Sequence, residues 1–184
     1  ILVGINTVLA DDPSLTARAA SAGAKSQPSR LRRIILDSRA RTPLNARVVT
    51  DDSAGLTTIV VTSAAAKKRV AALSKLVSII IAPARDGRID LRWLMRALGK
   101  QSVASLLVEG GGEVNASFLE TGLAQRVAFF YAPKILGGRD SLTGVAGKGA
   151  TRLADLIHLE NISWRQLGCD LLLTGRVRKN ARRS

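Results

Sequence analysis

The stretch from Ser105 to Leu119, SLLVEGGGEVNASFL, carries the signals that decide the fold. An apolar run of strand length ends at Glu109, passes through three glycines and enters a helical pattern. Glycine lets a ligand approach the backbone closely, and the free N–H groups of a helix N-terminus bind phosphate. The stretch therefore predicts a pyrophosphate site at a strand-to-helix turn. A tight turn without a ligand is the alternative, because the spacing differs from the G-x-G-x-x-G dinucleotide fingerprint.

Two carboxylates flank this turn, and we expect them to have different roles. Glu113 lies in the first helical turn, where an acid suits the helix dipole but repels a phosphate, so its side chain must point away from a bound anion. Glu109 follows a strand end, where open α/β sheets place their ligands. There it can hydrogen-bond a heterocycle or cap a neighbouring backbone amide.

Outward from this stretch, short apolar and β-branched runs recur along the chain. They occupy residues 1–5, 34–36, 58–61, 77–82, 105–108 and 127–132. These runs are continuous rather than alternating, which is typical of strands covered on both faces. Helical patterns fill residues 64–76 and 91–98, the second with Asp90 placed to cap it.

The C-terminal part predicts a different strand arrangement. Residues 164–167 and 171–177 flank Gly168-Cys169-Asp170, which indicates a hairpin of two antiparallel strands. Residues 19–29 are rich in Ala, Ser, Gly and Pro and predict a loop. The sequence thus predicts an α/β fold: a mostly parallel central sheet flanked by helices, with an antiparallel C-terminal hairpin at its edge.

A second group of polar side chains follows the first predicted strand, in GINTVLADDPSLTAR at residues 4–18. Thr7 and Asp11 can bind a ribose or an amide, and Arg18 can clamp a phosphate with its planar fork. Asp11 and Asp12 by themselves are weak grounds for a magnesium site. Because residues 35–39 and 60–63 also end strands in hydroxyl or carboxylate groups, we expect one shared polar rim.

Composition bounds the remaining function classes. The 184 residues fit a single domain, and 28 Lys and Arg against 14 Asp and Glu give a net charge of +14, which suits anionic ligands. Only 3% of residues are aromatic and the positive charge is scattered, so nucleic acid is not expected as a partner. One cysteine and one histidine exclude a disulfide framework and a cysteine zinc cluster, and point to the cytoplasm. No apolar run reaches the roughly 18 residues of a membrane span, so no membrane partner is expected.

Five segments taken together resemble one known family. They are residues 1–18 (ILVGINTVLADDPSLTAR), 35–43 (ILDSRARTP), 106–119 (LLVEGGGEVNASFL), 131–138 (YAPKILGG) and 172–177 (LLTGRV). They resemble the reductase domain of the bifunctional riboflavin-biosynthesis deaminase/reductase. The resemblance implies a dihydrofolate-reductase-like fold, a homodimer, NADPH as hydride donor, and reduction of 5-amino-6-(5-phosphoribosylamino)uracil to its ribitylamino product.

The resemblance also implies site residues by their position in these motifs. Substrate contacts fall on Leu15, Arg18 and Glu109. The basic surplus fits recognition of a 2′-phosphate, for which Ser63 is a candidate from its strand-end position. No catalytic residue and no metal ligand is assigned. The implied cofactor contacts are Thr7, Asp11, Ser38, Gly111, Gly112, Glu113, Val114, Asn115, Ala116 and Ser117.

The family's reductase domain opens with a further strand and helix, preceded by a zinc-dependent deaminase domain, and neither matches this sequence. We therefore expect residues 1–184 to form one reductase domain without its opening segment, holding part of the site. In the implied reaction the ribosylamine opens to an imine and C1′ receives a hydride, with Asp11 or a water as proton relay. Two alternatives stay open: a reductase of the non-deaminated diaminopyrimidine, and a non-catalytic basic nucleic-acid-binding module.

Overall fold

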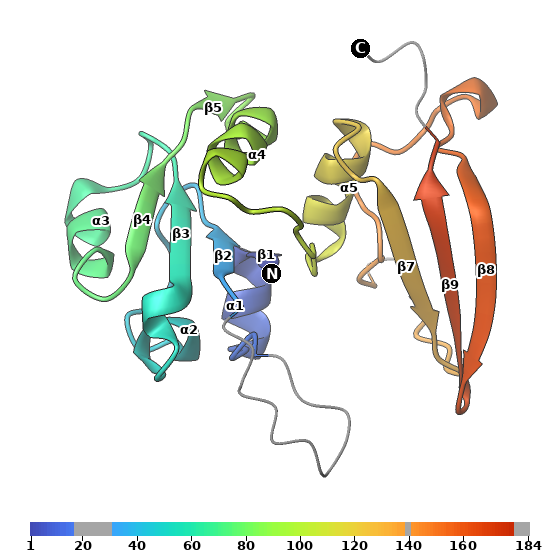
Figure 1. Ribbon diagram of the computed structural model, residues 1–184, viewed down its shortest axis with the longest axis horizontal. Helices are drawn as coiled ribbons and strands as arrows, with labels where there is room; N and C mark the ends of the chain where they lie inside the picture. The colour runs from blue at the N-terminus through green and yellow to red at the C-terminus, as the bar shows by residue number, and fades with distance from the viewer. Residues whose placement is uncertain (17–30, 139–140, 179–184) are drawn as a thin grey trace.

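The structure is a computed structural model that describes residues 1–16, 31–138 and 141–178. Its N-terminal half contains a sheet of four parallel strands in the order β1 (Leu2–Gly4), β2 (Arg33–Leu36), β3 (Thr57–Val61) and β4 (Ser78–Ile81). Figure 1 shows this sheet on the left, with helices packed around it.

Both faces of the parallel sheet are covered, because successive side chains of a strand point to opposite faces. Leu2, Ile34 and Val60 pack against α4 (Leu91–Lys100) and α5 (Gly112–Glu120). Their strand neighbours Val3 and Ile35 pack in a second cluster with three helices. These helices are α1 (Ile5–Asp11), α2 (Arg47–Thr50) and α3 (Lys67–Leu73). The double coverage explains why β1, β2 and β3 are apolar without alternation and confirms the prediction for them. The prediction is wrong for β4 and β7, because Ile81 and Phe130 are 63% and 66% exposed.

The antiparallel strands form a sheet of their own. β8 (Leu159–Leu167) and β9 (Asp170–Val177) make the predicted hairpin, and β9 also pairs with β7 (Arg126–Tyr131), giving the order β7-β9-β8. The hairpin therefore does not hydrogen-bond directly to the parallel sheet within the described ranges. In Figure 1, β7 is the strand of its sheet nearest to the parallel sheet, and α5 lies between the two.

Several predicted boundaries differ from the structure, among them the start of β8 at Leu159 instead of residue 164. Residue 5 opens α1 instead of ending the first strand, because Ile5 and Val8 are one helical turn apart and both are buried. Residues 105–108 form only a single parallel bridge, between Leu2 and Val108, since they pair on one side alone. The helix predicted over residues 64–76 is shorter, because a turn in which the Ala65 N–H donates to the Thr62 carbonyl at 3.0 Å precedes it.

The short helix α2 was not predicted from the sequence, and neither were four other short elements. They are the 3-10 helices η1 (Ala54–Leu56) and η2 (Leu153–Asp155) and the two-residue strands β5 (Ala84–Arg85) and β6 (Arg88–Ile89). Asp90 caps α4 as expected, since its carboxylate accepts the Trp93 N–H at 2.9 Å. In the part of the chain that is described, no helix has the length and apolar character to cross a bilayer.

Candidate cofactor and substrate site

The predicted polar rim forms at the carboxyl ends of the parallel strands. The chain leaves β1 at Gly4, β2 at Asp37 and β3 at Thr62, and parallel strands bring these ends to one edge of the sheet. Glu109 joins the same edge, because its N–H donates to the Leu2 carbonyl at 2.9 Å. Its side chain is exposed, so it is available to a ligand.

Hydrogen bonds hold the turn after β2 against its neighbours. The Ser38 carbonyl accepts both the N–H of Thr62 at 3.1 Å and its hydroxyl at 2.9 Å. Asp37 is fully buried, and its Oδ2 accepts the N–H and the hydroxyl of Thr42 at 2.7 and 2.8 Å. Arg41 reaches α1, donating to the Asn6 side-chain oxygen at 3.1 Å. The backbone around Ser38 is therefore fixed before any ligand arrives.

The three glycines before α5 have different structural roles. A Cβ on Gly110 would lie 2.5 Å from the Val114 Cβ, so this glycine is needed for packing within the turn. A Cβ on Gly112 would lie 2.5 Å from the Thr143 carbonyl oxygen, in the loop that covers this side of the helix. Gly111 has nothing within 4 Å of its Cβ position. The open side of the turn at Gly111 is thus where a ligand can approach the backbone.

The first turn of α5 offers unpaired donors beside Gly111. No side chain caps the helix at Gly111, and among the described residues the backbone N–H groups of Gly112 and Glu113 have no recorded acceptor. Helix N-terminal N–H groups of this kind bind phosphate. The residues present therefore fit the diphosphate of a dinucleotide. The other side of this turn contacts the loop that contains Gly144 and Ala146. The Ala146 N–H donates to the Gly112 carbonyl at 3.0 Å, and the Asn115 side-chain amide donates to the Gly144 carbonyl at 2.8 Å.

Glu113 is held by a cation that was not predicted to belong to the site. Arg88, on β6, donates to the Glu113 Oε2 at 3.0 Å and to the Ser117 hydroxyl at 3.3 Å. The carboxylate is therefore paired with a guanidinium beside the predicted phosphate position. The sequence signal for this contact was Asp86-Gly87, a typical hairpin turn three residues before the buried Ile89, which fixes where Arg88 lies.

The side chains of the segment after β1 differ in exposure and in their contacts with the protein. Thr7 is half-buried and Asp11 is exposed, both on α1. Asp12 is engaged by Arg47, whose N–H and Nε donate to it at 2.8 and 3.2 Å, so the two neighbouring acids do not act as a pair. Leu15 is half-buried against the core.

Some predicted site residues make no contact with one another, and one lies outside the described residues. The structure records no hydrogen bond between Thr7 or Asp11 and the residues of α5 in the described ranges. Arg18 and the predicted loop at 19–29 lie outside the described residues. Ser63 is exposed at the end of β3, next to Thr62.

A buried arginine anchors the segment that leads to Leu15. Arg33 is 1% exposed, and its guanidinium pairs with both carboxylate oxygens of Asp51 at 2.7 Å. It also donates to the Ser14 carbonyl at 2.7 Å, the Val48 carbonyl at 3.1 Å and the Thr57 hydroxyl at 2.8 Å. The hydrogen bond from Arg33 lowers the pKa of Asp51 below its usual value, against the opposing effect of burial. The sequence showed Arg33 only as one of several arginines before an apolar run.

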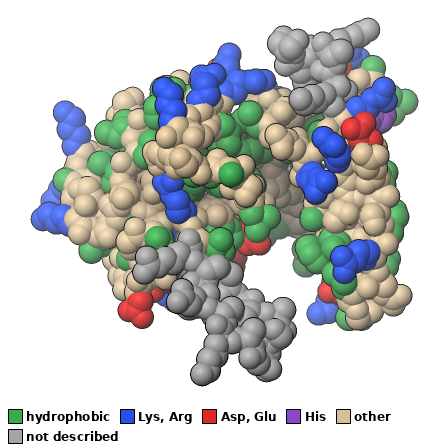
Figure 2. All heavy atoms as spheres, viewed as in Figure 1, with side chains coloured by type: hydrophobic (Ala, Val, Ile, Leu, Met, Phe, Trp, Pro, Cys, Tyr) green, Lys and Arg blue, Asp and Glu red, His purple; other side chains and the backbone are tan. Residues whose placement is uncertain are grey.

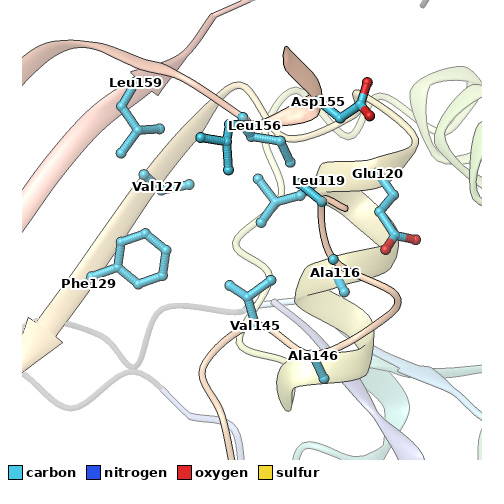
Figure 3. Close-up of a pocket in the computed structure, with 13 residues that line it drawn as sticks. Ala116, Leu119, Glu120, Val127, Phe129, Val145, Ala146, Asp155, Leu156 and Leu159 are labelled. Carbon is cyan, nitrogen blue, oxygen red and sulfur yellow. The ribbon is translucent and has the colours of Figure 1, made fainter. Parts of the chain in front are cut away.

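One cavity lies on the far side of α5 from the parallel sheet. Val114 and Phe118 pack toward that sheet, whereas Ala116, Leu119 and Glu120 line a cavity of about 290 Å³. In Figure 3 the apolar side chains point toward one another between α5 and β7, and the two carboxylates point away from them. The cavity is therefore apolar packing space between α5 and the antiparallel sheet, separate from the rim. The labelled lining residues are Ala116, Leu119, Glu120, Val127, Phe129, Val145, Ala146, Asp155, Leu156 and Leu159.

These features define a dihydrofolate-reductase-like α/β domain with polar residues at the carboxyl ends of its parallel strands. Residues 1–173 match the RibD C-terminal domain, and the chain belongs to this family.

Named relatives include two kinds of riboflavin-biosynthesis protein. The chain is 42% identical over 173 residues to the 2,5-diamino-6-ribosylamino-4(3H)-pyrimidinone 5′-phosphate reductase of Methanothermobacter thermautotrophicus, covering 94% of this chain and 77% of the relative. It is 36% identical over 174 residues to the riboflavin biosynthesis protein RibD of Actinobacillus pleuropneumoniae. That match covers 94% of this chain but only 44% of the relative.

Solved structures show the same fold. Acinetobacter baumannii RibD superposes with a TM-score of 0.78 at 24% identity, over 96% of this chain and 46% of that one. The riboflavin biosynthesis reductase Rib7 of Saccharomyces cerevisiae gives a TM-score of 0.73 at 24% identity, over 96% of this chain and 74% of that one.

Proposed function

We propose that this domain is a reductase of riboflavin biosynthesis that uses NADPH to reduce the ribosylamino group of a phosphorylated pyrimidine to a ribitylamino group. One observation carries the proposal: in a chain of this family, the open turn at Gly111 and the donors of Gly112 and Glu113 lie at the ligand-binding edge of the parallel sheet. A nicotinamide cofactor supplies a hydride when bound. The protein must therefore hold the cofactor and the substrate in contact and exclude water.

The residues of the rim divide into two proposed groups. Gly111 to Ser117 would hold the diphosphate, with Thr7, Asp11 and Ser38 completing the cofactor contacts. In this run the side chains of Glu113, Val114 and Ala116 are not offered to the diphosphate, because they contact Arg88, the core and the cavity between α5 and β7 respectively.

The substrate group is Leu15, Arg18 and Glu109, with Arg18 on the phosphate and Glu109 on the heterocycle. Asp11 is exposed and is one candidate for the proton relay, with a bound water as the other.

Two substrates fit the proposal and differ in one exocyclic group. The first is 5-amino-6-(5-phosphoribosylamino)uracil, which the resemblance to the bifunctional enzyme implies. The second is the non-deaminated diaminopyrimidinone, and the 42% identity to a reductase named for it favours this candidate. Steady-state kinetics with both compounds separates them, since the preferred substrate gives the higher kcat/KM.

We also propose that the domain works as a cytoplasmic homodimer. The antiparallel sheet exposes large apolar side chains: Phe130 is 66% exposed, Trp164 59% and Tyr131 50%. The Tyr131 and Trp164 rings lie 6.0 Å apart, so they form one patch. Exposed patches of this kind are typical of protein–protein contacts.

The relatives also extend beyond the matched region, and the family resemblance implies a strand and helix ahead of it. Both β7 and residues 105–108 pair with another strand on one side only among the described residues. We propose that such a strand would join the two sheets by pairing with these edges.

The proposed function is tested by titrating the protein with NADPH and NADH while following nicotinamide fluorescence. We expect saturable binding that is tighter for NADPH, and weakened binding by Gly111→Ala, because the added methyl group occupies the open side of the turn. Binding of NADPH that is unaffected by Gly111→Ala would move the cofactor away from α5. The proposal would be contradicted if neither this protein nor a longer reductase that contains this domain bound NADPH or NADH.

A further inference from the structure

The hairpin that carries Arg88 is held rigidly at the start of α5. β5 and β6 are antiparallel, with Arg85 directly opposite Arg88. The two residues between them, Asp86 and Gly87, have φ angles of 51° and 74°, as a tight two-residue hairpin turn requires. The next residue, Ile89, is 8% exposed in the core, so the backbone at Arg88 is fixed from both sides.

The Arg88 guanidinium lies along the first part of α5. It bonds Glu113 and Ser117, which are one turn apart on the helix, at 3.0 and 3.3 Å. The Ser117 hydroxyl in turn donates to the Glu113 carbonyl at 2.8 Å. Because the two charged side chains are 65% and 56% exposed, the pair contributes little to folding stability.

The same pair bears on the binding of an anion at the helix N-terminus. Glu113 is the second residue of α5, next to the free N–H groups, so its charge opposes a bound diphosphate. Lys and Arg side chains also gather over β5 and α4 in Figure 2, but only Arg88 is recorded in contact with this carboxylate in the described ranges.

We propose that Arg88 determines cofactor affinity by cancelling the charge of Glu113 at the diphosphate site. This inference rests on the proposed function. It adds Arg88, on β6, to the residues that affect cofactor binding. Arg88 acts as a positioning residue, because it works through Glu113. A unit charge about 8 Å from a diphosphate in water-like surroundings changes affinity roughly three- to fivefold at low salt.

The hairpin supplies a matched control. Arg85 is exposed, faces Arg88 across the hairpin and has no recorded side-chain partner among the described residues. Arg85→Ala therefore removes one positive charge from the same hairpin but leaves the ion pair between Arg88 and Glu113 intact. The variants Arg88→Ala, Arg85→Ala, Glu113→Gln and the double variant Arg88→Ala with Glu113→Gln form a complete set.

The test is the NADPH dissociation constant of each variant at about 20 mM and about 300 mM salt, since screening separates charge effects from contact effects. We expect Arg88→Ala to weaken binding roughly three- to fivefold at low salt and much less at high salt. Arg85→Ala should have a clearly smaller effect, and Glu113→Gln should restore the binding of Arg88→Ala. Thermal unfolding of each variant confirms that the hairpin is intact.

Two results would overturn the inference: equal losses for Arg88→Ala and Arg85→Ala, or failure of Glu113→Gln to restore affinity. Both are distinct from failure of the proposed function, in which the unmodified protein itself does not bind NADPH.

Discussion

Replacing Asp51 by Asn tests the buried anchor around Arg33, at the start of β2. The change keeps the shape of the side chain but removes its charge and sets an amide donor against a guanidinium that is 1% exposed. All five N–H donors of Arg33 are used in the native protein, two of them by Asp51 at 2.7 Å. The substitution therefore leaves a buried cation without its counter-charge.

The expected cost follows from this geometry. Breaking a buried ion pair by removing one partner destabilises a protein by about 3–5 kcal/mol, which is an upper bound here because the Asp51 side chain is 25% exposed. For a domain of this length each kcal/mol lowers the melting temperature by roughly 2–4 °C, so the shift should be about 6–20 °C. Because Arg33 also binds the Ser14 carbonyl, the segment leading to Leu15 should loosen as well.

The pH dependence of this effect has a defined sign. Arg33 holds the pKa of Asp51 below its usual value in the folded state, so the stabilisation is fully present above the ordinary aspartate pKa of about 3.9. It is lost as the pH falls through the lower pKa of the folded state. The difference between native protein and variant should therefore be constant from about pH 5 to 7 and shrink below about pH 4.

Thermal unfolding followed by circular dichroism measures both effects, with Asp52→Asn as the control. Asp52 is the next residue, is exposed and has no recorded partner among the described residues, so its loss should change stability by no more than about 0.5 kcal/mol. If Asp51→Asn and Asp52→Asn melt together, the buried pair does not anchor the fold and the reasoning is refuted.

Three further outcomes are expected. Gly110→Ala should lose about 1–3 kcal/mol of stability in denaturant unfolding, because its Cβ would lie 2.5 Å from the Val114 Cβ, and a loss no larger than that of Gly111→Ala would contradict this. Glu109→Gln should lower kcat/KM about tenfold or more while NADPH binding is unchanged, since bonds to charged groups are worth about 1.5–3 kcal/mol; an unchanged kcat/KM removes Glu109 from the substrate site. Trp164→Glu should convert the proposed dimer to a monomer in light scattering, because a charge replaces a side chain that is 59% exposed; a dimeric variant would exclude this patch as the interface.

The sequence predicted the parallel sheet well because the physical signal was local. Continuous β-branched runs such as residues 34–36 and 58–61 indicate strands covered on both faces, and the helices on both faces confirm this. The Asp90 cap was equally predictable, since capping needs only a side chain and an amide three residues on.

The polar rim was predictable in outline for a related reason. Parallel strands place their carboxyl ends together, so Ser38, Ser63 and Glu109 could be assigned to one edge without knowing the strand order. Their motif context predicted the family, which the match over residues 1–173 confirms. Which of them touch a ligand stays a prediction.

Other features depended on contacts between residues far apart in the chain. The sequence could not separate Arg33 from its neighbours, because its burial follows from Asp51 and Thr57 meeting it across the sheet. The placement of the hairpin with β7 was also not local, since the pattern of a strand does not state which edge it joins.

By itself, then, the sequence determined the element types, the polar strand ends and the glycine turn, because each depends on the conformational preferences of a few adjacent residues. Tertiary structure alone decided that Gly111 is the open glycine, that Arg88 pairs with Glu113 and that Arg33 is buried. These facts depend on which surfaces the fold brings within a few ångströms of each other. Charge and packing act over that distance, and residue order alone does not specify it.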